Sequence, residues 1–339
     1  MKRKFKVARI DDTGGSADLT IEARELAKVN AEVVGFDCVT DDEKIEAAKD
    51  ADAILTLTAY ITRRVIEAAP KCQVIARYGI GYEKVDVDAA TDNGILVVNV
   101  PDFCWEEVSN HAIVLFLACA KKLVLLDKFT RRGGWTDWAE SRDIISPMVS
   151  IHGQTLGVIG CGNIGRTTAK KAQCFKLSVL GYDPYVDKSL AKESGITLVS
   201  LPELLKKSDF VSISALLSEE TRHLIGEKEL KQMKPTAYLI NTARGGIVDE
   251  PALVKALQEK WIAGAGLDVF EKEPVDPNNP LFKMDNVTVT PHSAAASDAA
   301  LERVRISVGQ EVARVFSGQW PKNVVNKTVK PKINLVKAD

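Results

Sequence analysis

Three side chains with complementary chemistry each follow an apolar run that predicts a buried strand: Arg244, Glu273 and His292. An arginine can hold a carboxylate through two parallel hydrogen bonds. A histidine exchanges protons near neutral pH because its reference pKa is about 6.5, and a neighbouring carboxylate favours its charged form. The trio therefore fits proton exchange with an oxygen of a bound carboxylic acid.

The sequence leaves simpler interpretations open for these residues. Arg244 precedes two glycines, which suit either a crowded ligand site or an ordinary surface turn. Glu273 and His292 are predicted to lie past the carboxyl ends of strands in one sheet, but sequence alone does not show that they touch. The other histidines are interpreted as a core or hinge residue in a helix (His111) and as surface residues (His152 and His223).

A glycine-rich motif, Gly160-x-Gly162-x-x-Gly165, lies between an apolar run at 156–159 and a helical pattern at 164–175. In a dinucleotide-binding turn the first glycine permits the tight turn and the second lets a pyrophosphate approach the backbone. The third glycine lets helix and strand pack closely. The helix N-terminus then offers N–H groups and a positive dipole end to the phosphates. A plain structural turn is the alternative, but the strand and helix flanking the motif favour dinucleotide binding.

An acidic residue follows the next apolar run, Ser178–Tyr182. Asp183 can accept hydrogen bonds from the adenosine ribose, and its charge would repel a 2′-phosphate. The cofactor predicted from this position is therefore NAD (NADH) and not NADP.

A second glycine-containing loop follows the predicted strand Val74–Arg77 and reads Tyr78-Gly79-Ile80-Gly81. Backbone N–H groups at the carboxyl end of a strand can face the crevice where ligands of open α/β sheets bind. The loop is interpreted as a ligand loop, with a tight turn as the alternative.

The elements that position these residues alternate between strand and helix, which predicts parallel sheets covered by helices. One long helix is expected from about Glu106 to Arg131, with an apolar middle that would be buried. The loop 133–138 carries two tryptophans that could line a pocket or a subunit contact. The tail Val329–Asp339 is expected to be loosely held.

Composition limits the classes of function. A chain of 339 residues predicts two domains, and a net charge of −1 gives no field that would attract nucleic acid or an anionic membrane. No apolar run approaches the ~18–20 residues that span a bilayer, and no signal peptide is predicted. The six cysteines show no metal-ligand spacing and fit a reducing cytoplasm. Cys161 is interpreted as a small residue beside the cofactor, with a reactive thiol as the alternative.

Several of these motifs together resemble the D-isomer-specific 2-hydroxyacid dehydrogenases along nearly the whole chain. The branch related to the C-terminal-binding proteins is the most similar, and phosphoglycerate dehydrogenases are close relatives. The resemblance is carried by 77–86, 160–165, 241–245, 266–274 and 291–294, and the branch by 99–108.

The resemblance implies an α/β fold of two Rossmann-like, doubly wound parallel-sheet domains, one inserted into the other. The substrate-binding (catalytic) domain would comprise residues 1–104 and 296–339, and the NAD-binding domain residues 105–295. It also implies a homodimer built through the cofactor domains, and an active site in a cleft.

Site residues carried over by position are also expectations from the resemblance. Arg244 would bind the substrate, His292 would be the acid/base, Glu273 would pair with His292, and Asp268 would lie near the nicotinamide amide. The expected cofactor-binding residues are Gly160, Gly162, Asn163, Ile164, Gly165, Asp183, Ala215, Leu216, Thr221, Thr242, Ala243, Arg244, Asp268 and His292. The expected substrate-binding residues are Tyr78, Gly79, Ile80, Gly81, Arg244 and His292. No metal is implied.

The chain departs from the family at two places. It has Ser214-Ala215-Leu216-Leu217-Ser218 where relatives often read His-x-Pro-Leu-Thr, and Ser293–Ala296 where relatives often place glycines. Both changes bear on the substrate, which stays open among glyoxylate, hydroxypyruvate, a larger 2-oxo acid and 3-phosphoglycerate. Specificity is expected near four aromatic residues, Phe103, Trp105, Trp135 and Trp138.

The competing hypothesis is an NAD(H)-sensing interaction protein of the corepressor type, since fold alone does not decide function. The chain retains every acid/base residue and has almost no extra tail that could bind partners. The enzyme is therefore the preferred interpretation.

Overall fold

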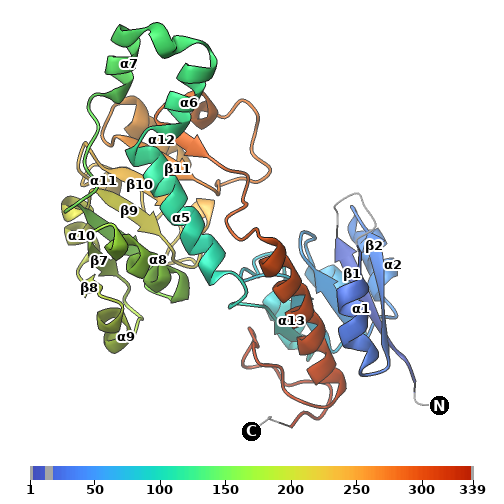
Figure 1. Cartoon of the computed structure of the whole chain (residues 1–339). Helices are drawn as coiled ribbons and strands as arrows, with labels where there is room; N and C mark the ends of the chain where they lie inside the picture. The colour runs from blue at the N-terminus through green and yellow to red at the C-terminus, as the bar shows by residue number, and fades with distance from the viewer. Residues whose placement is uncertain (1–2, 12–17, 337–339) are drawn as a thin grey trace. The chain divides into compact units, whose positions relative to one another are not determined.

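The computed structural model describes residues 3–11 and 18–336, which form two compact units (Figure 1). Unit 1 comprises Met1–Cys104 and Ser297–Asp339, and unit 2 comprises Trp105–Ala296. The chain leaves unit 1 once and returns to it for its last helix, so unit 2 is an insertion within unit 1.

Unit 1 is built on a five-stranded parallel sheet of order β2-β1-β3-β4-β5. The strands are β1 (Phe5–Asp11), β2 (Ala31–Asp37), β3 (Ala53–Thr56), β4 (Val74–Arg77) and β5 (Leu96–Val98). The helices are α1 (Thr20–Ala27), α2 (Asp41–Ala48), α3 (Arg63–Glu67), α4 (Val87–Asp92) and α13 (Asp298–Phe316). Thr56 pairs with Arg77, so the loops that follow β3 and β4 start side by side.

Unit 2 contains a seven-stranded parallel sheet of order β12-β11-β10-β9-β6-β7-β8. The strands are β6 (Thr155–Ile159), β7 (Ser178–Tyr182), β8 (Thr197–Leu198), β9 (Phe210–Ile213), β10 (Tyr238–Asn241), β11 (Gly264–Leu267) and β12 (Val287–Val289). The strand order reverses between β6 and β9, and ligands of open α/β sheets bind outside the carboxyl ends of strands at such a switch point.

The helices of unit 2 lie before and between these strands along the chain. They are α5 (Trp105–Ala120), α6 (Leu123–Arg131), α7 (Trp138–Ile145), α8 (Asn163–Cys174), α9 (Lys188–Glu193), α10 (Leu201–Lys207), α11 (Glu227–Leu230) and α12 (Glu250–Gln258). Short 3₁₀ turns lie at Gly134–Thr136, Gly245–Ile247 and Pro280–Lys283.

Both faces of the unit 2 sheet are buried. Val158 and Ile240 lie in one apolar cluster with Phe116 of α5, whereas Ile159 and Leu239 lie in a second cluster with Leu253 of α12. Neighbouring residues of one strand point to opposite faces, so a strand covered on both faces must be apolar throughout. This explains the continuous apolar runs of the sequence and confirms the predicted fold class.

The single long helix predicted for Glu106–Arg131 is wrong. The structure has α5 and α6, which are separated at Lys122, a residue in the left-handed conformation with φ 49°. Lysine favours helices, so local propensity gives no warning of this break. The Nζ atom of Lys122 donates to the carbonyl oxygen of Ile144, 2.7 Å away, and this tertiary contact fixes the turn.

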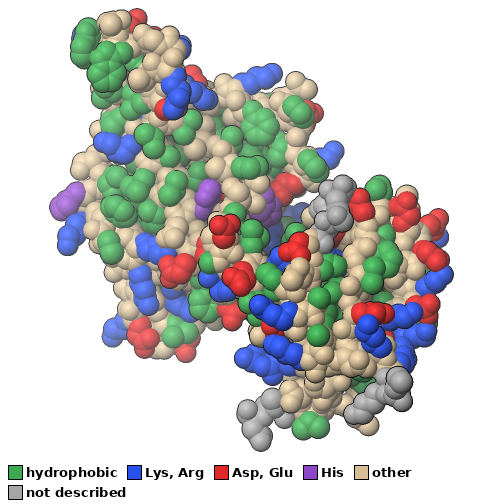
Figure 2. Space-filling view, turned by 45° about the vertical axis from the view of Figure 1, so that its right-hand side comes forward, with side chains coloured by type: hydrophobic (Ala, Val, Ile, Leu, Met, Phe, Trp, Pro, Cys, Tyr) green, Lys and Arg blue, Asp and Glu red, His purple; other side chains and the backbone are tan. Residues whose placement is uncertain are grey.

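The segment beyond this break projects from the body of unit 2 as an arm formed by α6, the turn Gly134–Thr136 and α7 (Figure 1). The predicted loop at 133–138 is therefore partly helical. Trp135 and Trp138 are 71% and 73% exposed on the arm, and hydrophobic side chains gather at this end of unit 2 in Figure 2.

The prediction that the tail Val329–Asp339 is loosely held is also wrong for the part of it that the structure describes. Val329 is buried, Leu335 packs against the unit 1 core, and the N–H of Val336 donates to the carbonyl oxygen of Gly318. Residues 337–339 lie outside the described residues. Among the helices that the structure describes, none combines the length and apolar character needed to cross a membrane.

Candidate active site

Three adjacent strand ends of unit 2 are joined in a short ladder. The N–H of Asp268 donates to the carbonyl oxygen of Asn241, and the N–H of His292 donates to the carbonyl oxygen of Asp268, at 2.9 and 2.8 Å. The loops that follow β10, β11 and β12 therefore begin at one edge of the sheet. These are the loops that carry Arg244, Glu273 and His292.

Two members of the predicted trio are in direct contact. The Nδ1 atom of His292 lies 2.7 Å from Oε2 of Glu273, and the side chains are 48% and 36% exposed. A carboxylate that accepts from Nδ1 fixes the orientation of the ring. The Nε2 atom is then the ring nitrogen that can exchange a proton with a ligand.

The Glu273 carboxylate is held from two sides. Its Oε1 atom accepts the N–H of Phe270 at 3.0 Å, while Oε2 faces His292. Burial acts to raise the pKa of the Glu273 carboxyl, but the hydrogen bonds from His292 and Phe270, with the positive charge of Arg244, outweigh it and hold the pKa below its usual value. Glu273 is therefore suited to remain an anion beside a charged imidazole.

Arg244 is positioned by a turn that only glycine permits. The side chain of Asn241 accepts the N–H of Ala243 and donates to the carbonyl oxygen of Arg244, at 3.0 and 2.9 Å. A Cβ atom on Gly245 would lie 1.8 Å from the carbonyl carbon of Phe270. The absence of a side chain at Gly245 thus lets the Arg244 turn lie directly against the segment that leads to Glu273.

Asp268 is completely buried, and its carboxylate accepts several hydrogen bonds from the segment around His292. Oδ1 accepts from the Thr290 hydroxyl at 2.6 Å and from the N–H of Ser293 at 2.9 Å, and Oδ2 accepts from the N–H of Ala294 at 2.9 Å. In this structure the Asp268 side chain organises the histidine loop. Its expected place near the nicotinamide stays a prediction.

The glycine-rich turn has the geometry that a dinucleotide needs. Gly160 has φ +88°, and a Cβ atom there would lie 2.5 Å from the backbone nitrogen of Ala215. A Cβ atom on Gly165 would lie 2.0 Å from the carbonyl oxygen of Gly160, whereas nothing lies within 4 Å of the Cβ position of Gly162. The first and third glycines are required by packing, and the second leaves open space at the start of α8, where Asn163 and Ile164 lie in the first turn.

Asp183 lies beside this turn at the end of β7. Its Oδ2 atom accepts the N–H of Cys161 at 2.8 Å, and its Oδ1 atom accepts the N–H groups of Tyr185 and Val186 at 2.8 and 3.0 Å. A carboxylate has about four lone-pair sites, so acceptor capacity remains. Cys161 itself is buried, and burial raises the pKa of its thiol to about 12, which argues against the reactive-thiol alternative.

Two buried hydroxyl groups lie at neighbouring strand ends next to the glycine-rich turn. Ser214 and Thr242 follow β9 and β10, and neither hydroxyl has a hydrogen-bond partner among the described residues. Buried polar groups are normally paired, so this edge suits a polar ligand. Thr221, by contrast, donates its hydroxyl to the carbonyl oxygen of the exposed Leu216 at 2.6 Å.

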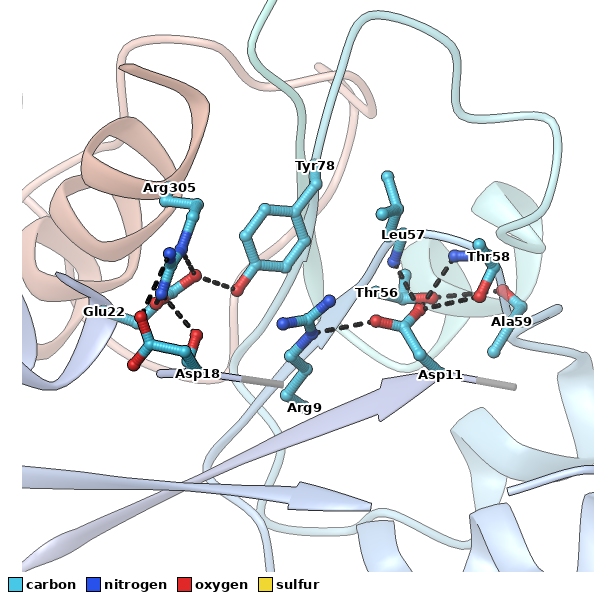
Figure 3. A network of polar contacts seen from close by, with 10 residues as sticks. All are labelled: Arg9, Asp11, Asp18, Glu22, Thr56, Leu57, Thr58, Ala59, Tyr78 and Arg305. Carbon is cyan, nitrogen blue, oxygen red and sulfur yellow. Dashed lines mark hydrogen bonds and ion pairs between the residues drawn. The ribbon is translucent and has the colours of Figure 1, made fainter. Parts of the chain in front are cut away.

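In unit 1, the predicted ligand loop is fixed through its first residue. The hydroxyl of Tyr78 donates to Glu22 at 2.9 Å, and only 4% of the residue is exposed (Figure 3). Burial, with the negative charge of Glu22, raises the pKa of the Tyr78 phenol well above its usual value. The Tyr78 side chain anchors the loop, and the expected contact of this residue with substrate stays a prediction.

The anchor belongs to a polar network that spans α1, α13 and the ends of β1 and β3. Arg305 of α13 donates to both oxygens of Glu22 at 2.9 and 2.8 Å, and the Arg9 guanidinium lies 5.1 Å from the centre of the Tyr78 ring (Figure 3). Arg9 in turn pairs with Asp11, 2.9 Å away.

The rest of the loop is held through its backbone. Gly79 has φ +124° and its carbonyl oxygen accepts the N–H of Val100 at 2.9 Å. The side chain of Asn99 donates to the carbonyl oxygen of Ile80 at 2.7 Å. These contacts use carbonyl oxygens, and the expected role of the Ile80 and Gly81 N–H groups toward a carboxylate stays a prediction.

Comparison with known proteins decides the family. The model of the family described as "D-isomer specific 2-hydroxyacid dehydrogenase, NAD binding domain" matches residues 113–294. The chain belongs to the D-isomer-specific 2-hydroxyacid dehydrogenase family. It is therefore an oxidoreductase, and unit 2 contains the family's nicotinamide dinucleotide-binding domain.

Individual members of the family support this assignment. The glyoxylate reductase of Korarchaeum cryptofilum is 43% identical over 291 residues, which cover 84% of this chain and 86% of that protein. A D-lactate dehydrogenase from Aquifex aeolicus, solved with NAD and lactic acid, has a TM-score of 0.81 and 29% identity, covering 94% of this chain and 99% of that one.

A third member differs in its cofactor. An NADPH-dependent glyoxylate/hydroxypyruvate reductase from Sinorhizobium meliloti, solved with NADP and malonate, has a TM-score of 0.82 and 29% identity, covering 98% of this chain and 100% of that one. These family members are named as enzymes and give no support to the interaction-protein hypothesis.

Proposed function

We propose that this dehydrogenase uses NADH to reduce the carbonyl group of a small 2-oxo acid, reversibly, with His292 as the acid/base. The observation that carries the proposal is the contact between His292 and Glu273 at 2.7 Å, at the sheet edge that also carries Arg244. A histidine oriented by a carboxylate beside an arginine can protonate an oxygen of a bound acid.

The roles of the remaining residues follow from their chemistry. A bound nicotinamide cofactor supplies the hydride that reduces the carbonyl carbon. Arg244 holds the substrate carboxylate and carbonyl, and the backbone at Ile80 and Gly81 receives the carboxylate. His292 gives its Nε2 proton to the carbonyl oxygen, while Glu273 stabilises the imidazolium and fixes the ring.

We propose that the cofactor is NAD and not NADP. The support is the carboxylate of Asp183 at the end of β7, because a negative charge at this place repels a 2′-phosphate. The open space at Gly162 and the buried hydroxyls of Ser214 and Thr242 suit the rest of the dinucleotide.

We propose a substrate of the glyoxylate, hydroxypyruvate or phosphoglycerate type. The relatives named above act on different acids, and the specificity expected from Trp135 and Trp138 has weak support because both lie on the projecting arm. Phe103 remains a candidate, since its ring lies 3.9 Å from the Cβ position of Gly79.

We also propose a homodimer and a cytoplasmic location. The arm and the nearby part of α5 expose large hydrophobic side chains, namely Val114, Leu123, Trp135, Trp138 and Ile145. A cavity of about 270 Å³ lies at the base of the arm, lined by Val124, Leu125 and Pro147 among others. Exposed apolar surface of this kind suits a subunit contact. The structure describes all six cysteines and pairs none of them in a disulfide, which suits a reducing compartment.

NADH oxidation by a panel of 2-oxo acids tests the proposal. The panel contains glyoxylate, hydroxypyruvate, pyruvate, phenylpyruvate and phosphohydroxypyruvate, with NADPH as the control cofactor. Turnover of at least one acid is expected, with a loss of ~10²-fold or more in His292→Ala, as for removal of a general acid. Equal activity of His292→Ala would contradict the proposed role.

A further inference from the structure

A chain of hydrogen bonds runs from helix α5 to the histidine loop of unit 2. The Nε2 atom of His111 lies 2.8 Å from the hydroxyl oxygen of Thr290, and that hydroxyl lies 2.6 Å from Oδ1 of Asp268. His111 is 20% exposed in its side chain and Asp268 is completely buried. The assigned roles of the predicted site residues do not use His111 or Thr290.

The direction of these hydrogen bonds follows from counting protons. The Thr290 hydroxyl donates its single proton to Oδ1 of Asp268. The oxygen of Thr290 must then accept from His111, which requires a proton on Nε2 of His111. The contact thus requires a form of the His111 ring that carries a proton on Nε2.

At the other end of this series of hydrogen bonds, Asp268 fixes the backbone on both sides of His292. Asp268 accepts from Thr290, two residues before His292, and from the N–H groups of Ser293 and Ala294 directly after it. His292 itself has φ +51°, a conformation that few non-glycine residues adopt without surrounding contacts that impose it. Asp268 supplies those contacts.

The His111 end of this series of hydrogen bonds is also held in place. Lys171 of α8 donates to the hydroxyl of Ser109 and to the side-chain oxygen of Asn110, at 2.6 and 2.7 Å. Both residues directly precede His111 on α5. The imidazole of His111 therefore projects from a helix whose first turns are tied to the dinucleotide-binding helix.

We propose that His111 and Thr290 are positioning residues for catalysis, which hold His292 in its strained conformation through Asp268. The inference rests on the proposed role of His292 as the acid/base. His111 does not exchange a proton with the substrate. It acts by donating from Nε2 to Thr290, and so restricts the backbone from which the His292 ring projects.

Nuclear magnetic resonance on the wild-type chain tests the proton arrangement directly. The protein has four histidines, so the imidazole ¹H–¹⁵N spectrum is simple to assign with single His→Gln variants. A proton on Nε2 of His111 is expected at neutral pH. A neutral ring protonated only on Nδ1 would overturn the proposal, and this measurement requires neither substrate nor cofactor.

Rate measurements on variants of Thr290 test whether its hydroxyl affects catalysis. Thr290→Val removes the hydroxyl with almost no change of shape, and Thr290→Ser restores it. A displacement of the acid by a fraction of an ångström lowers the rate of the chemical step. We expect kcat to fall ~10-fold or more in Thr290→Val with KM for the 2-oxo acid changed less than ~3-fold, and to recover to within ~3-fold of wild type in Thr290→Ser.

His111 offers a second matched pair. His111→Leu removes the donor, whereas His111→Gln retains an N–H group close to the position of Nε2. The double variant His111→Leu/Thr290→Val should lose no more kcat than the worse single variant, because both changes interrupt one chain. Independent, multiplying losses would overturn the proposal, and circular dichroism on each variant identifies simple unfolding.

The two proposals fail differently. If His292→Ala is inactive while folded Thr290→Val and His111→Leu both keep wild-type kcat, the positioning role is wrong and the acid/base role stands. If His292→Ala is as active as wild type, the acid/base role is wrong. Should Thr290→Val and His111→Leu both unfold, the spectrum of the wild-type His111 ring and the kcat of His111→Gln decide.

Discussion

Nδ1 of His292 and Oε2 of Glu273 lie 2.7 Å apart, although the two residues belong to loops that follow different strands. The contact depends on parallel strands β11 and β12 ending at the same edge of the sheet. It also requires Glu273 to be drawn inward by the N–H of Phe270. One carboxylate thereby orients the ring so that Nε2 is the ring nitrogen available to exchange a proton.

Glu273→Gln is expected to weaken the support that His292 receives. Glutamine carries no charge and has a single side-chain oxygen, so it cannot accept from both Nδ1 of His292 and the N–H of Phe270, as Glu273 does. We expect the reductive kcat/KM to fall ~10-fold or more at neutral pH, because the ring is held less firmly. NADH oxidation measured on both proteins checks this. An unchanged kcat/KM would remove Glu273 from the mechanism.

The same carboxyl predicts how stability depends on pH. Its pKa in the folded chain lies below the ordinary value of 4.5, so its interactions stabilise the fold above that value and are lost as the pH falls through the folded pKa. The difference in melting temperature between wild type and Glu273→Gln should therefore be largest near neutral pH and shrink below about pH 4.5. Thermal melts from pH 3 to pH 8 measure it, and a difference that grows on acidification would contradict the assignment.

Cofactor choice is predicted to depend on Asp183. Asp183→Asn removes the charge and leaves a single side-chain oxygen, which can still accept the N–H groups of Tyr185 and Val186 but not that of Cys161 as well. We expect the ratio of kcat/KM for NADPH to that for NADH to rise ~10-fold or more, because the repulsion of a 2′-phosphate is lost. Asp187→Asn is the matched control, since Asp187 caps α9 through the N–H of Ser189. An equal rise in the control would mean that general charge, and not Asp183, sets the preference.

Most strands could be predicted from sequence because they are short, mainly apolar runs between helical patterns. Ala53–Thr56, Val74–Arg77 and Phe210–Ile213 were predictable to the residue, since burial on both faces makes three of the four residues in each apolar. The break at Lys122 was not predictable. A tertiary hydrogen bond to Ile144 fixes a conformation that lysine does not favour.

The candidate site also has features that could be predicted from the sequence and features that could not. Arg244, Glu273 and His292 could be found because each follows a strand, but their contacts depend on the register of β10, β11 and β12. The link between His111 and Thr290 spans 179 positions along the chain, and no local pattern signals it. The contact of Tyr78 with Glu22, which Arg305 also holds, could not be predicted from sequence, because the two partners come from distant helices.

Adjacent glycines in the Arg244 turn give the sharpest test of how the site is built. A Cβ atom on Gly245 would lie 1.8 Å from the backbone of Phe270, whereas the nearest atom to a Cβ on Gly246 is a flexible Leu217 methyl 3.4 Å away. Gly245→Ala must therefore push the Arg244 turn away from the segment that leads to Glu273. We expect it to cost ~1–3 kcal/mol or more of unfolding free energy and most of kcat. Gly246→Ala should retain wild-type stability within ~1 kcal/mol and most of kcat. Chemical denaturation and NADH oxidation measured on both variants check this, and equal behaviour of the two would show that the contact between the Arg244 turn and Phe270 does not control the site.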